Sequence, residues 1–142
     1  MMQAASKRIL LCDDEVHILR AAEFKFKRAG YDVTCACDGE EAWDLIQKQV
    51  PDVVVTDCQM PRLSGLSLAE RIKNNPGTAH IPVIMLTGKG FELSPHDLKE
   101  NYGIYMLLGK PFSPRELFQH VEAILGLGEP PPSHASNLTQ VL

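Results

Sequence analysis

Long hydrophobic runs and an excess of positive charge are both missing from this sequence. No apolar stretch approaches the ~18 residues that a membrane-spanning helix needs, and the run from Ile9 to Cys12 is too short for a signal-peptide core. Lys and Arg total 14 against 18 Asp and Glu, which gives a formal net charge of −4 and no broad basic surface for a nucleic-acid backbone. We therefore expect a cytoplasmic protein without membrane contact or direct nucleic-acid binding.

Cysteine is scarce too, and its spacing matches no metal or redox motif. Cys35 and Cys37 are separated by a single residue, which differs from the CxxC pattern of zinc and redox sites. All the cysteines lie within or beside apolar, strand-like runs, so we expect free, buried thiols in a reducing compartment. They are Cys12, Cys35, Cys37 and Cys58.

What remains is the composition of one folded domain. The chain has 142 residues, of which 44% are hydrophobic and 23% charged, as is typical of a globular domain. The segment 126–142 differs, because it carries consecutive prolines and no apolar period of useful length. We predict a folded domain over residues 7–125 and a Pro-rich, flexible tail or linker over 126–142.

Short apolar runs alternate along this domain with segments of helical periodicity. Residues 52–57 are mainly β-branched without polar alternation, as in a strand buried on both faces of a parallel sheet. Helix starts are indicated by Asp38 with Glu41 three residues later, and by the Ser-Pro pairs at 94–95 and 113–114. The predicted strands are 8–12, 31–37, 52–57, 81–87 and 104–108, and one helix follows each.

Five strands alternating with five helices predict an α/β fold. Such alternation favours a five-stranded parallel sheet that is doubly wound, with helices on both faces and right-handed crossovers. In sheets of this kind, ligands bind at the carboxyl ends of the strands. The residues at those ends are therefore the candidates for a functional site.

Four of the five predicted strands end in residues that can handle a phosphate group. Asp13 and Asp14 follow the first strand and Asp57 ends the third. Clustered carboxylates of this kind can stay ionised beside a hard cation such as Mg²⁺. Thr87 ends the fourth strand and Lys110 follows the fifth. Singly, each has an ordinary explanation as a helix cap, a turn, a strand end or a solvated lysine, but together they indicate one site.

The residue types also indicate the chemistry. Asp57 is the best candidate nucleophile, because its strand is the middle one in chain order and a carboxylate can form an aspartyl phosphate. Asp13 and Asp14 would bind the metal ion. Lys110 and the Thr87 hydroxyl would contact the oxygens of the transferred phosphoryl group and stabilise their charge.

At these positions the sequence resembles the response-regulator receiver domains, the CheY-like family of two-component signalling. The resemblance covers roughly Lys7 to Leu125. It rests on four motifs whose separations of 43, 30 and 23 residues are similar to those of the family. The motifs are Asp13-Asp14, Asp57-Cys-Gln-Met-Pro61 followed by Gly65, Leu86-Thr-Gly88, and Lys110-Pro111-Phe112.

This resemblance implies a Mg²⁺-dependent (or Mn²⁺-dependent) phosphoacceptor. Asp57 would receive a phosphoryl group from a sensor histidine kinase or phosphotransfer protein. Thr87 would be the switch hydroxyl and Lys110 the phosphate contact. The metal ligands would be Asp13, Asp14, Asp57 and the backbone carbonyl of Gln59.

The resemblance further implies the flavodoxin/CheY-like (β/α)5 fold and a cis peptide bond at Lys110–Pro111. Such a domain is not a conventional enzyme, because it catalyses only its own phosphorylation and dephosphorylation. Phosphorylation would switch a protein-interaction surface around the fourth helix, the fifth strand and the last helix. The output would come from a downstream protein or from an output domain outside these residues.

One position departs from the family pattern. An aromatic residue usually stands three residues before the lysine, and here that residue is Leu107. Tyr105 lies two residues earlier, on the same face of the strand but further from Thr87. We therefore predict that aromatic switching is weakened or relocated.

Two other classes of protein compete with this interpretation. A pseudo-receiver would dock to partners without being controlled by phosphorylation, and Leu107 leaves this alternative open. A phosphotransferase of the haloacid-dehalogenase type also uses a strand-end aspartate, but it needs a second acid two residues later. Gln59 occupies that position, which argues against turnover of an external substrate.

Overall fold

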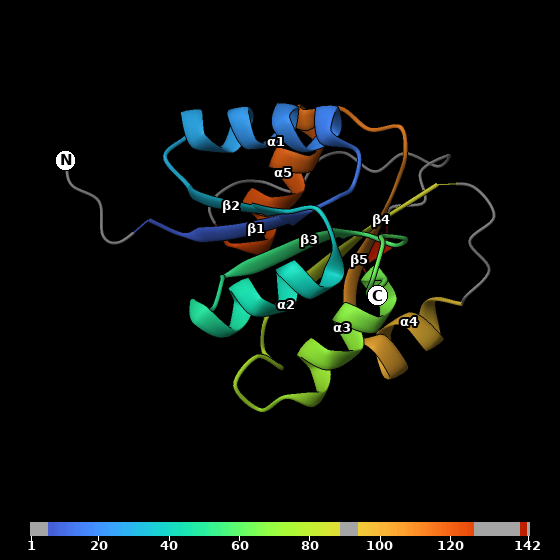
Figure 1. Cartoon of the computed structure of the whole chain (residues 1–142). Helices are drawn as coiled ribbons and strands as arrows, with labels where there is room; N and C mark the ends of the chain where they lie inside the picture. Colours follow the sequence, from blue (N-terminus) through green and yellow to red (C-terminus); the bar gives the residue numbers. More distant parts are fainter. Residues whose placement is uncertain (1–5, 89–93, 127–139, 142) are drawn as a thin grey trace.

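Figure 1 shows the computed structural model of the protein, which describes residues 6–88, 94–126 and 140–141. One sheet forms its centre, with the strands in the spatial order β2-β1-β3-β4-β5-β6. The strands are β1 (Arg8–Cys12), β2 (Asp32–Ala36), β3 (Val53–Asp57), β4 (Val83–Thr87), β5 (Ile104–Gly109) and β6 (Gln140–Val141). The helices are α1 (Val16–Arg28), α2 (Gly39–Lys48), α3 (Gly65–Asn74), α4 (Pro95–Tyr102) and α5 (Pro114–Ile124). None of the helices in these ranges has the length and apolar character needed to cross a bilayer.

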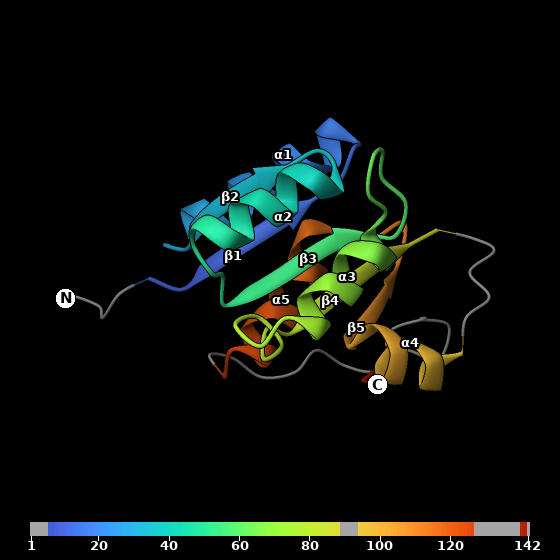
Figure 2. The same cartoon turned by 60° about the horizontal axis from the view of Figure 1, so that its bottom comes forward.

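β1 to β5 are parallel and carry helices on both faces of the sheet. α1 and α5 cover one face, and α2, α3 and α4 cover the other, as Figures 1 and 2 show. Successive side chains of a strand point to opposite faces of the sheet, so each strand contributes to the hydrophobic core on both faces. Leu10 of β1 packs on the α2–α3 side, whereas Ile9 and Leu11 pack on the α1–α5 side. The predicted doubly wound α/β fold, with its five parallel strands, is confirmed.

The middle of the sheet is the best-buried part of the structure. All residues of β3 and of β4 are buried, including the polar Thr56, Asp57 and Thr87. Each apolar side chain buried in this way contributes about 1.5–3 kcal/mol relative to exposure. The strands that end at Asp57 and Thr87 are therefore held firmly by packing on both faces.

Capping side chains fix where the helices begin. The Asp38 carboxylate accepts the Glu41 backbone N–H at 2.8 Å, and the Glu41 carboxylate accepts the Cys37 N–H at 2.9 Å. The predicted capping pair thus forms, although Glu41 reaches one residue further back than in the usual box. Ser94 and Ser113 cap α4 and α5, each accepting the N–H three residues on.

β6 is an element that the sequence analysis does not predict. It pairs antiparallel with β5 and lies within the segment expected to be a tail or linker. Two residues show no recognisable strand periodicity, which explains why the sequence pattern misses it. Residues 127–139 of that segment lie outside the described residues.

The expectation of four buried cysteines holds for only two of them. All four thiols are free; Cys12 and Cys58 are buried, Cys35 is partly buried and Cys37 is exposed. β2 is an edge strand, so Cys35 has a neighbouring strand on one side only. Cys37 lies just beyond the end of β2. The pattern of residues along one strand does not reveal whether that strand is at an edge.

Gly65 begins α3 against the backbone that follows β3. Its N–H donates to the Cys58 carbonyl at 2.9 Å, and a Cβ at this position would collide with the carbonyl oxygen of Asp57. A backbone carbonyl in a buried strand cannot move aside as the tip of a flexible side chain can. Only glycine therefore lets α3 begin so close to Asp57.

Replacing Gly65 with alanine should lower the free energy of unfolding by about 1–3 kcal/mol, the usual cost of overpacking a buried position. Gly77→Ala is the matched control, because a Cβ there meets only Asn75 Oδ1, at an ordinary contact distance of 3.4 Å. We expect the control to change the free energy of unfolding by less than ~0.5 kcal/mol. Urea denaturation measures both, and equal stability of the two variants would contradict the close approach.

Candidate functional site

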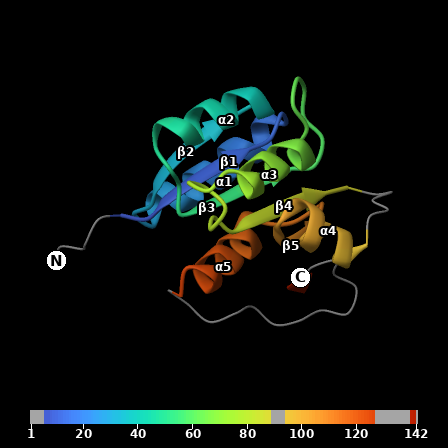
Figure 3. The same ribbon diagram turned by 90° about the horizontal axis from the view of Figure 1, so that it is seen from below.

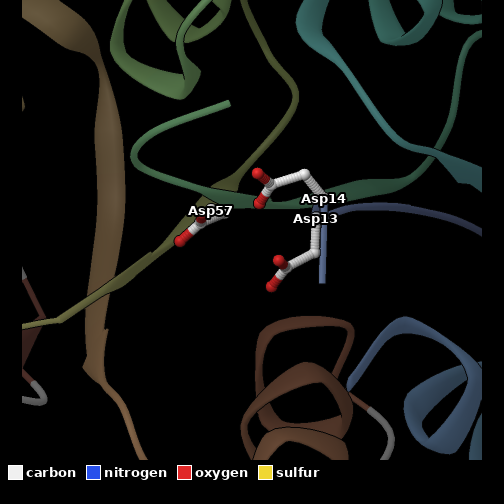
Figure 4. Close-up of side chains that lie close together, drawn as sticks. All are labelled: Asp13, Asp14 and Asp57. Carbon is white, nitrogen blue, oxygen red and sulfur yellow. The ribbon is translucent and has the colours of Figure 1, made fainter. Parts of the chain in front are cut away.

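Parallel pairing brings the acidic residues of β1 and β3 to the same edge of the sheet. Cys12 lies opposite Thr56, so the next residues on the two strands, Asp13 and Asp57, emerge side by side. Figure 4 shows Asp13, Asp14 and Asp57 gathered at this edge. One carboxylate oxygen from each of them lies within 4.8 Å of the other two. We call these three residues the acidic cluster.

The acidic cluster has the donor set of a hard-cation site. Asp13 is 2% exposed and Asp57 9%, whereas Asp14 is exposed. The cluster is therefore buried at Asp13 and Asp57 and open to solvent at Asp14. Asp13 Oδ1 accepts the Glu15 backbone N–H at 2.9 Å. Within the described residues, Asp13 Oδ2 is the one buried side-chain nitrogen or oxygen without a hydrogen-bond partner. Mg²⁺ prefers carboxylate oxygens, and binding it would satisfy this atom.

Lys110 places a positive charge among these carboxylates. Its Nζ lies 3.2 Å from Asp57 Oδ1 and 3.1 Å from Asp13 Oδ2, and it donates to Glu15 Oε1 at 2.7 Å. The contact with Asp13 is an ion pair that lacks hydrogen-bond alignment, so Asp13 Oδ2 keeps a free lone pair. Sequence reasoning identifies Lys110 but misses Glu15, whose only signal is that it directly follows the acidic pair.

Burial and mutual repulsion shift the pKa values of these groups. Burial raises the pKa of Asp13 and of Asp57 above the usual aspartate value, and the charge of Asp13 raises that of Asp57 further. For Lys110, burial lowers the pKa, but the hydrogen bond to Glu15 and the nearby aspartates outweigh it and leave the pKa above its ordinary value. Lys110 is therefore charged, while gathering the aspartates costs free energy that a cation would recover.

Thr87 reaches the same edge from β4. It is 2% exposed, and its hydroxyl donates to the Gly88 carbonyl at 3.2 Å instead of pointing its proton at the acidic cluster. Its pairing partner on β5 is Gly109, and its carbonyl accepts the Lys110 N–H at 2.7 Å. Thr87 thus joins β4 to the end of β5, immediately beside Lys110.

The remaining predicted features of the site are placed as follows. Gln59 lies in the loop between β3 and α3, two residues beyond Asp57, with its side chain exposed. The role of its carbonyl as a metal ligand stays a prediction. The Lys110–Pro111 peptide bond is cis, as the resemblance implies.

An aliphatic side chain occupies the position expected to be aromatic. Leu107 lies partly buried against the α2–α3 side of the core, and its partner on β4 is Met85, two residues before Thr87. Tyr105 is 40% exposed and lies where the pairing of β4 with β5 shifts register, between Ile104 and Met106. This irregularity interrupts the alternation from which a shared face of Tyr105 and Leu107 was expected, and the weakening of aromatic switching stays a prediction.

The site combines the Asp57 carboxylate, an ammonium in contact with it and a group of carboxylate oxygens with the right chemistry for a divalent cation. Such a combination suits a tetrahedral anion that is attacked by the carboxylate, because the cation and the ammonium would stabilise the charge on its oxygens. A metal-bound site for a neutral ligand would not need Lys110 to face Asp57.

Comparison with known sequences identifies the family to which this site belongs. The family described as the response regulator receiver domain matches residues 9–122. The alkaline phosphatase synthesis transcriptional regulatory protein PhoP of Bacillus subtilis is 36% identical over 124 residues, which cover 87% of this chain and 50% of that protein. The chain spans about half the length of the curated relatives that it matches.

Solved structures share the fold as well. A putative response regulator from Chloroflexus aurantiacus is 34% identical with a TM-score of 0.76, and the match covers 86% of this chain and 99% of that one. The receiver domain of a sensor histidine kinase from Pseudomonas aeruginosa, solved with a magnesium ion coordinated in its active site cleft, is 29% identical with a TM-score of 0.73 and the same coverage of 86% and 99%. Because the family match spans all five parallel strands and the acidic cluster, the chain belongs to the response regulator receiver domain family, the CheY-like domains of two-component signalling.

Proposed function

We propose that Asp57 accepts a phosphoryl group from a sensor histidine kinase or phosphotransfer protein, in a Mg²⁺-dependent reaction that switches a protein-interaction surface. The observation that carries this proposal is the contact of 3.2 Å between Asp57 Oδ1 and Lys110 Nζ beside the acidic cluster. A carboxylate that only capped a helix or closed a turn would not need a partly buried ammonium and two further carboxylates around it.

The transfer itself needs little from the protein beyond position and charge. A carboxylate oxygen of Asp57 forms a bond to phosphorus while the bond between phosphorus and the donor's imidazole nitrogen breaks. The electron pair of the broken bond stays on that nitrogen, which takes up a proton. Lys110 keeps Asp57 ionised before the reaction and contacts the added phosphoryl oxygens after it.

The metal ion would be held by Asp13, Asp14 and Asp57, with the backbone carbonyl of Gln59 as a further ligand. Mg²⁺, or Mn²⁺ in its place, supplies positive charge that offsets the charge on the phosphoryl oxygens. The unsatisfied Asp13 Oδ2 supports this assignment. So does the magnesium ion coordinated in the cleft of the similar domain from Pseudomonas aeruginosa.

Switching would begin at Thr87. A phosphoryl group on Asp57 offers oxygens that accept a hydrogen bond more strongly than the Gly88 carbonyl, which the Thr87 hydroxyl now contacts at 3.2 Å. Because Thr87 pairs with Gly109 and accepts the Lys110 N–H, its movement reaches β5 directly. The surface formed by α4, β5 and α5 is the part of the molecule that would change its affinity for partners.

The protein would be a switch and not a catalyst of external reactions. Its downstream target would be another protein or an output domain of a longer chain, consistent with relatives of which the match covers about half. Free thiols at all four cysteines support a reducing, cytoplasmic location.

Incubation with Mg²⁺ and a small phosphodonor such as acetyl phosphate should add one phosphoryl group to the wild-type protein and none to Asp57→Asn. Asp44→Asn is the matched control, because Asp44 is an exposed carboxylate on α2 outside the site. Intact-mass spectrometry measures the adduct. A wild-type protein that gains no mass would overturn the proposal in favour of a pseudo-receiver. An Asp57→Asn protein that gains as much mass would overturn the assignment of Asp57 as the acceptor.

Mg²⁺ alone should raise the free energy of unfolding of the wild-type protein. An ion that binds only the folded state adds about 2.7 kcal/mol at a concentration 100 times its dissociation constant. Asp13→Asn removes one charged ligand and should lose most of this gain, whereas Asp44→Asn should keep it. Urea denaturation with Mg²⁺ and with EDTA measures the difference, and the same gain in all three proteins would show that the ion binds elsewhere.

Thr87→Ala should accept the phosphoryl group on Asp57 but fail to transmit it. In the wild-type protein, phosphorylation should shift the NMR signals of the β5 amides, and in Thr87→Ala most of this shift should be lost. Thr87→Ser keeps the hydroxyl and should restore it. If the alanine and serine variants respond alike, the hydroxyl is not the link between Asp57 and β5.

A further inference from the structure

Glu15 is the residue of the site that the phosphoacceptor chemistry does not use. It directly follows the acidic pair, and its carboxylate accepts a hydrogen bond from Lys110 Nζ at 2.7 Å. The contacts of the same ammonium with Asp13 and Asp57 are ion pairs of 3.1 and 3.2 Å. The shortest of these three contacts of Lys110 is therefore with a carboxylate that is neither the proposed acceptor nor a proposed metal ligand.

This contact joins two strands that are not neighbours in the sheet. Glu15 lies just after β1 and Lys110 just after β5, and β3 and β4 lie between these two strands, as Figure 3 shows. β3 ends in Asp57 and β4 in Thr87. The hydrogen bond between Glu15 and Lys110 thus spans the strand ends that carry the proposed acceptor and the proposed switch hydroxyl.

The backbone of Glu15 is fixed, but the start of α1 does not need its side chain. Its N–H donates to Asp13 Oδ1 at 2.9 Å, and its carbonyl accepts the N–H groups of Ile18 and Leu19, both at 3.1 Å. Glu15 is the N-cap residue of α1, yet its side chain makes no capping hydrogen bond, and glutamate is not among the residues preferred there. The side chain is 47% exposed. It can therefore move away from Lys110 while the backbone stays in place.

A phosphoryl group on Asp57 would compete with Glu15 for Lys110. The metal ion would offset the charges of the acidic cluster, but Glu15 is not part of that cluster. Its carboxylate would therefore keep its full charge and its hydrogen bond when the metal is bound. A phosphoryl oxygen in contact with Lys110 would then lie near the Glu15 carboxylate, and like charges that share one ammonium repel each other.

We propose that Glu15 restrains Lys110 in the unphosphorylated protein and releases it when a phosphoryl group on Asp57 takes its place. This inference rests on the proposed function of Asp57 and adds a regulatory residue to it. Glu15 acts through Lys110 and does not touch the transferred group, so it is a positioning residue. By holding Lys110, it lowers the affinity of the site for an anion.

A double-mutant cycle tests whether the contact exists in the free protein. Glu15→Gln removes the charge of one partner and Lys110→Gln that of the other, and urea denaturation without Mg²⁺ measures both single variants and the double variant. The coupling between the two positions should change the unfolding equilibrium constant by about 2- to 5-fold, as is typical of exposed ion pairs. Additive effects would show that the two side chains do not interact in solution and would overturn the proposal.

Binding of beryllium trifluoride, an anion that mimics a phosphoryl group on aspartate, tests the competition. The NMR signals of the backbone amides measure its half-saturation concentration in the presence of Mg²⁺. Glu15→Gln should bind it about 2- to 5-fold more tightly than the wild-type protein, because Lys110 no longer has a charged competitor. Glu40→Gln is the matched control: the Glu40 side chain is 44% exposed and pairs with Arg71 instead of Lys110. It should bind the mimic as the wild-type protein does.

Glu15→Asp separates the contact from the charge. It keeps the negative charge, but its side chain is shorter by one methylene group and should lose the hydrogen bond to Lys110. Its affinity for the mimic should therefore lie closer to that of Glu15→Gln than to that of the wild-type protein. An aspartate variant that binds as the wild-type protein does would show that the contact is not the restraint. Weaker binding by Glu15→Gln would show that Glu15 prepares Lys110 for the anion. Either result overturns the proposal.

The same titration distinguishes a failure of this proposal from a failure of the proposed function. A wild-type protein that binds no mimic would overturn both. A wild-type protein that binds the mimic on Asp57, with equal binding by Glu15→Gln, would overturn the restraint by Glu15 and leave the phosphoacceptor function intact.

Discussion

The site depends on repulsion between carboxylates that the fold forces together. Three aspartates present oxygens within 4.8 Å of one another, and within the described residues one ammonium, that of Lys110, lies in contact with two of them. Burial is the main cause of the raised pKa values of Asp13 and Asp57, and the negative charges of Asp13 and Asp14 raise the pKa of Asp57 further. A divalent cation would relieve this repulsion, and in the proposed function the cation and Lys110 would together create a place for an anion with Asp57 as its acceptor.

Packing makes this unfavourable arrangement possible. β3 and β4 are buried on both faces, so the sheet fixes where Asp57 and Thr87 emerge, regardless of the charges at the strand ends. Gly65 allows α3 to begin directly against the backbone of Asp57. The free energy that holds the carboxylates together comes from the hydrophobic layers below them and not from the site.

β4 lies between the strand that carries Asp57 and the strand at the far side of the parallel sheet, β5. Thr87 is bonded through its carbonyl to the Lys110 N–H and is paired with Gly109 of β5. β5 is the strand whose edge β6 covers. Only β4 therefore separates β3, which carries Asp57, from β5, which pairs with β6.

Most of the fold and of the candidate site could be predicted from the sequence, because α/β alternation determines where the strand ends meet. The β-branched run 52–57 and the polar residues after each strand were sufficient to predict the sheet, the acidic cluster and Lys110. Glu15 was missed because its contact with Lys110 depends on how the start of α1 lies relative to the end of β5. The exposure of Cys37 and the pairing of β6 depend on which strands form the edges of the sheet. The residue pattern within a single strand does not reveal the order of the strands in the sheet.

In the proposed function, the acidic cluster, Lys110 and Thr87 act as one acceptor for a phosphoryl group. A crystal structure with Mg²⁺ and beryllium trifluoride, which mimics a phosphoryl group on aspartate, tests it most directly. We expect the mimic to be bonded to Asp57 and the metal ion to Asp13. Lys110 Nζ should contact a fluorine atom, and the Thr87 hydroxyl should turn from the Gly88 carbonyl to the mimic. An Asp57 carboxylate without the mimic, or a Thr87 hydroxyl still bonded to Gly88 in its presence, would contradict it.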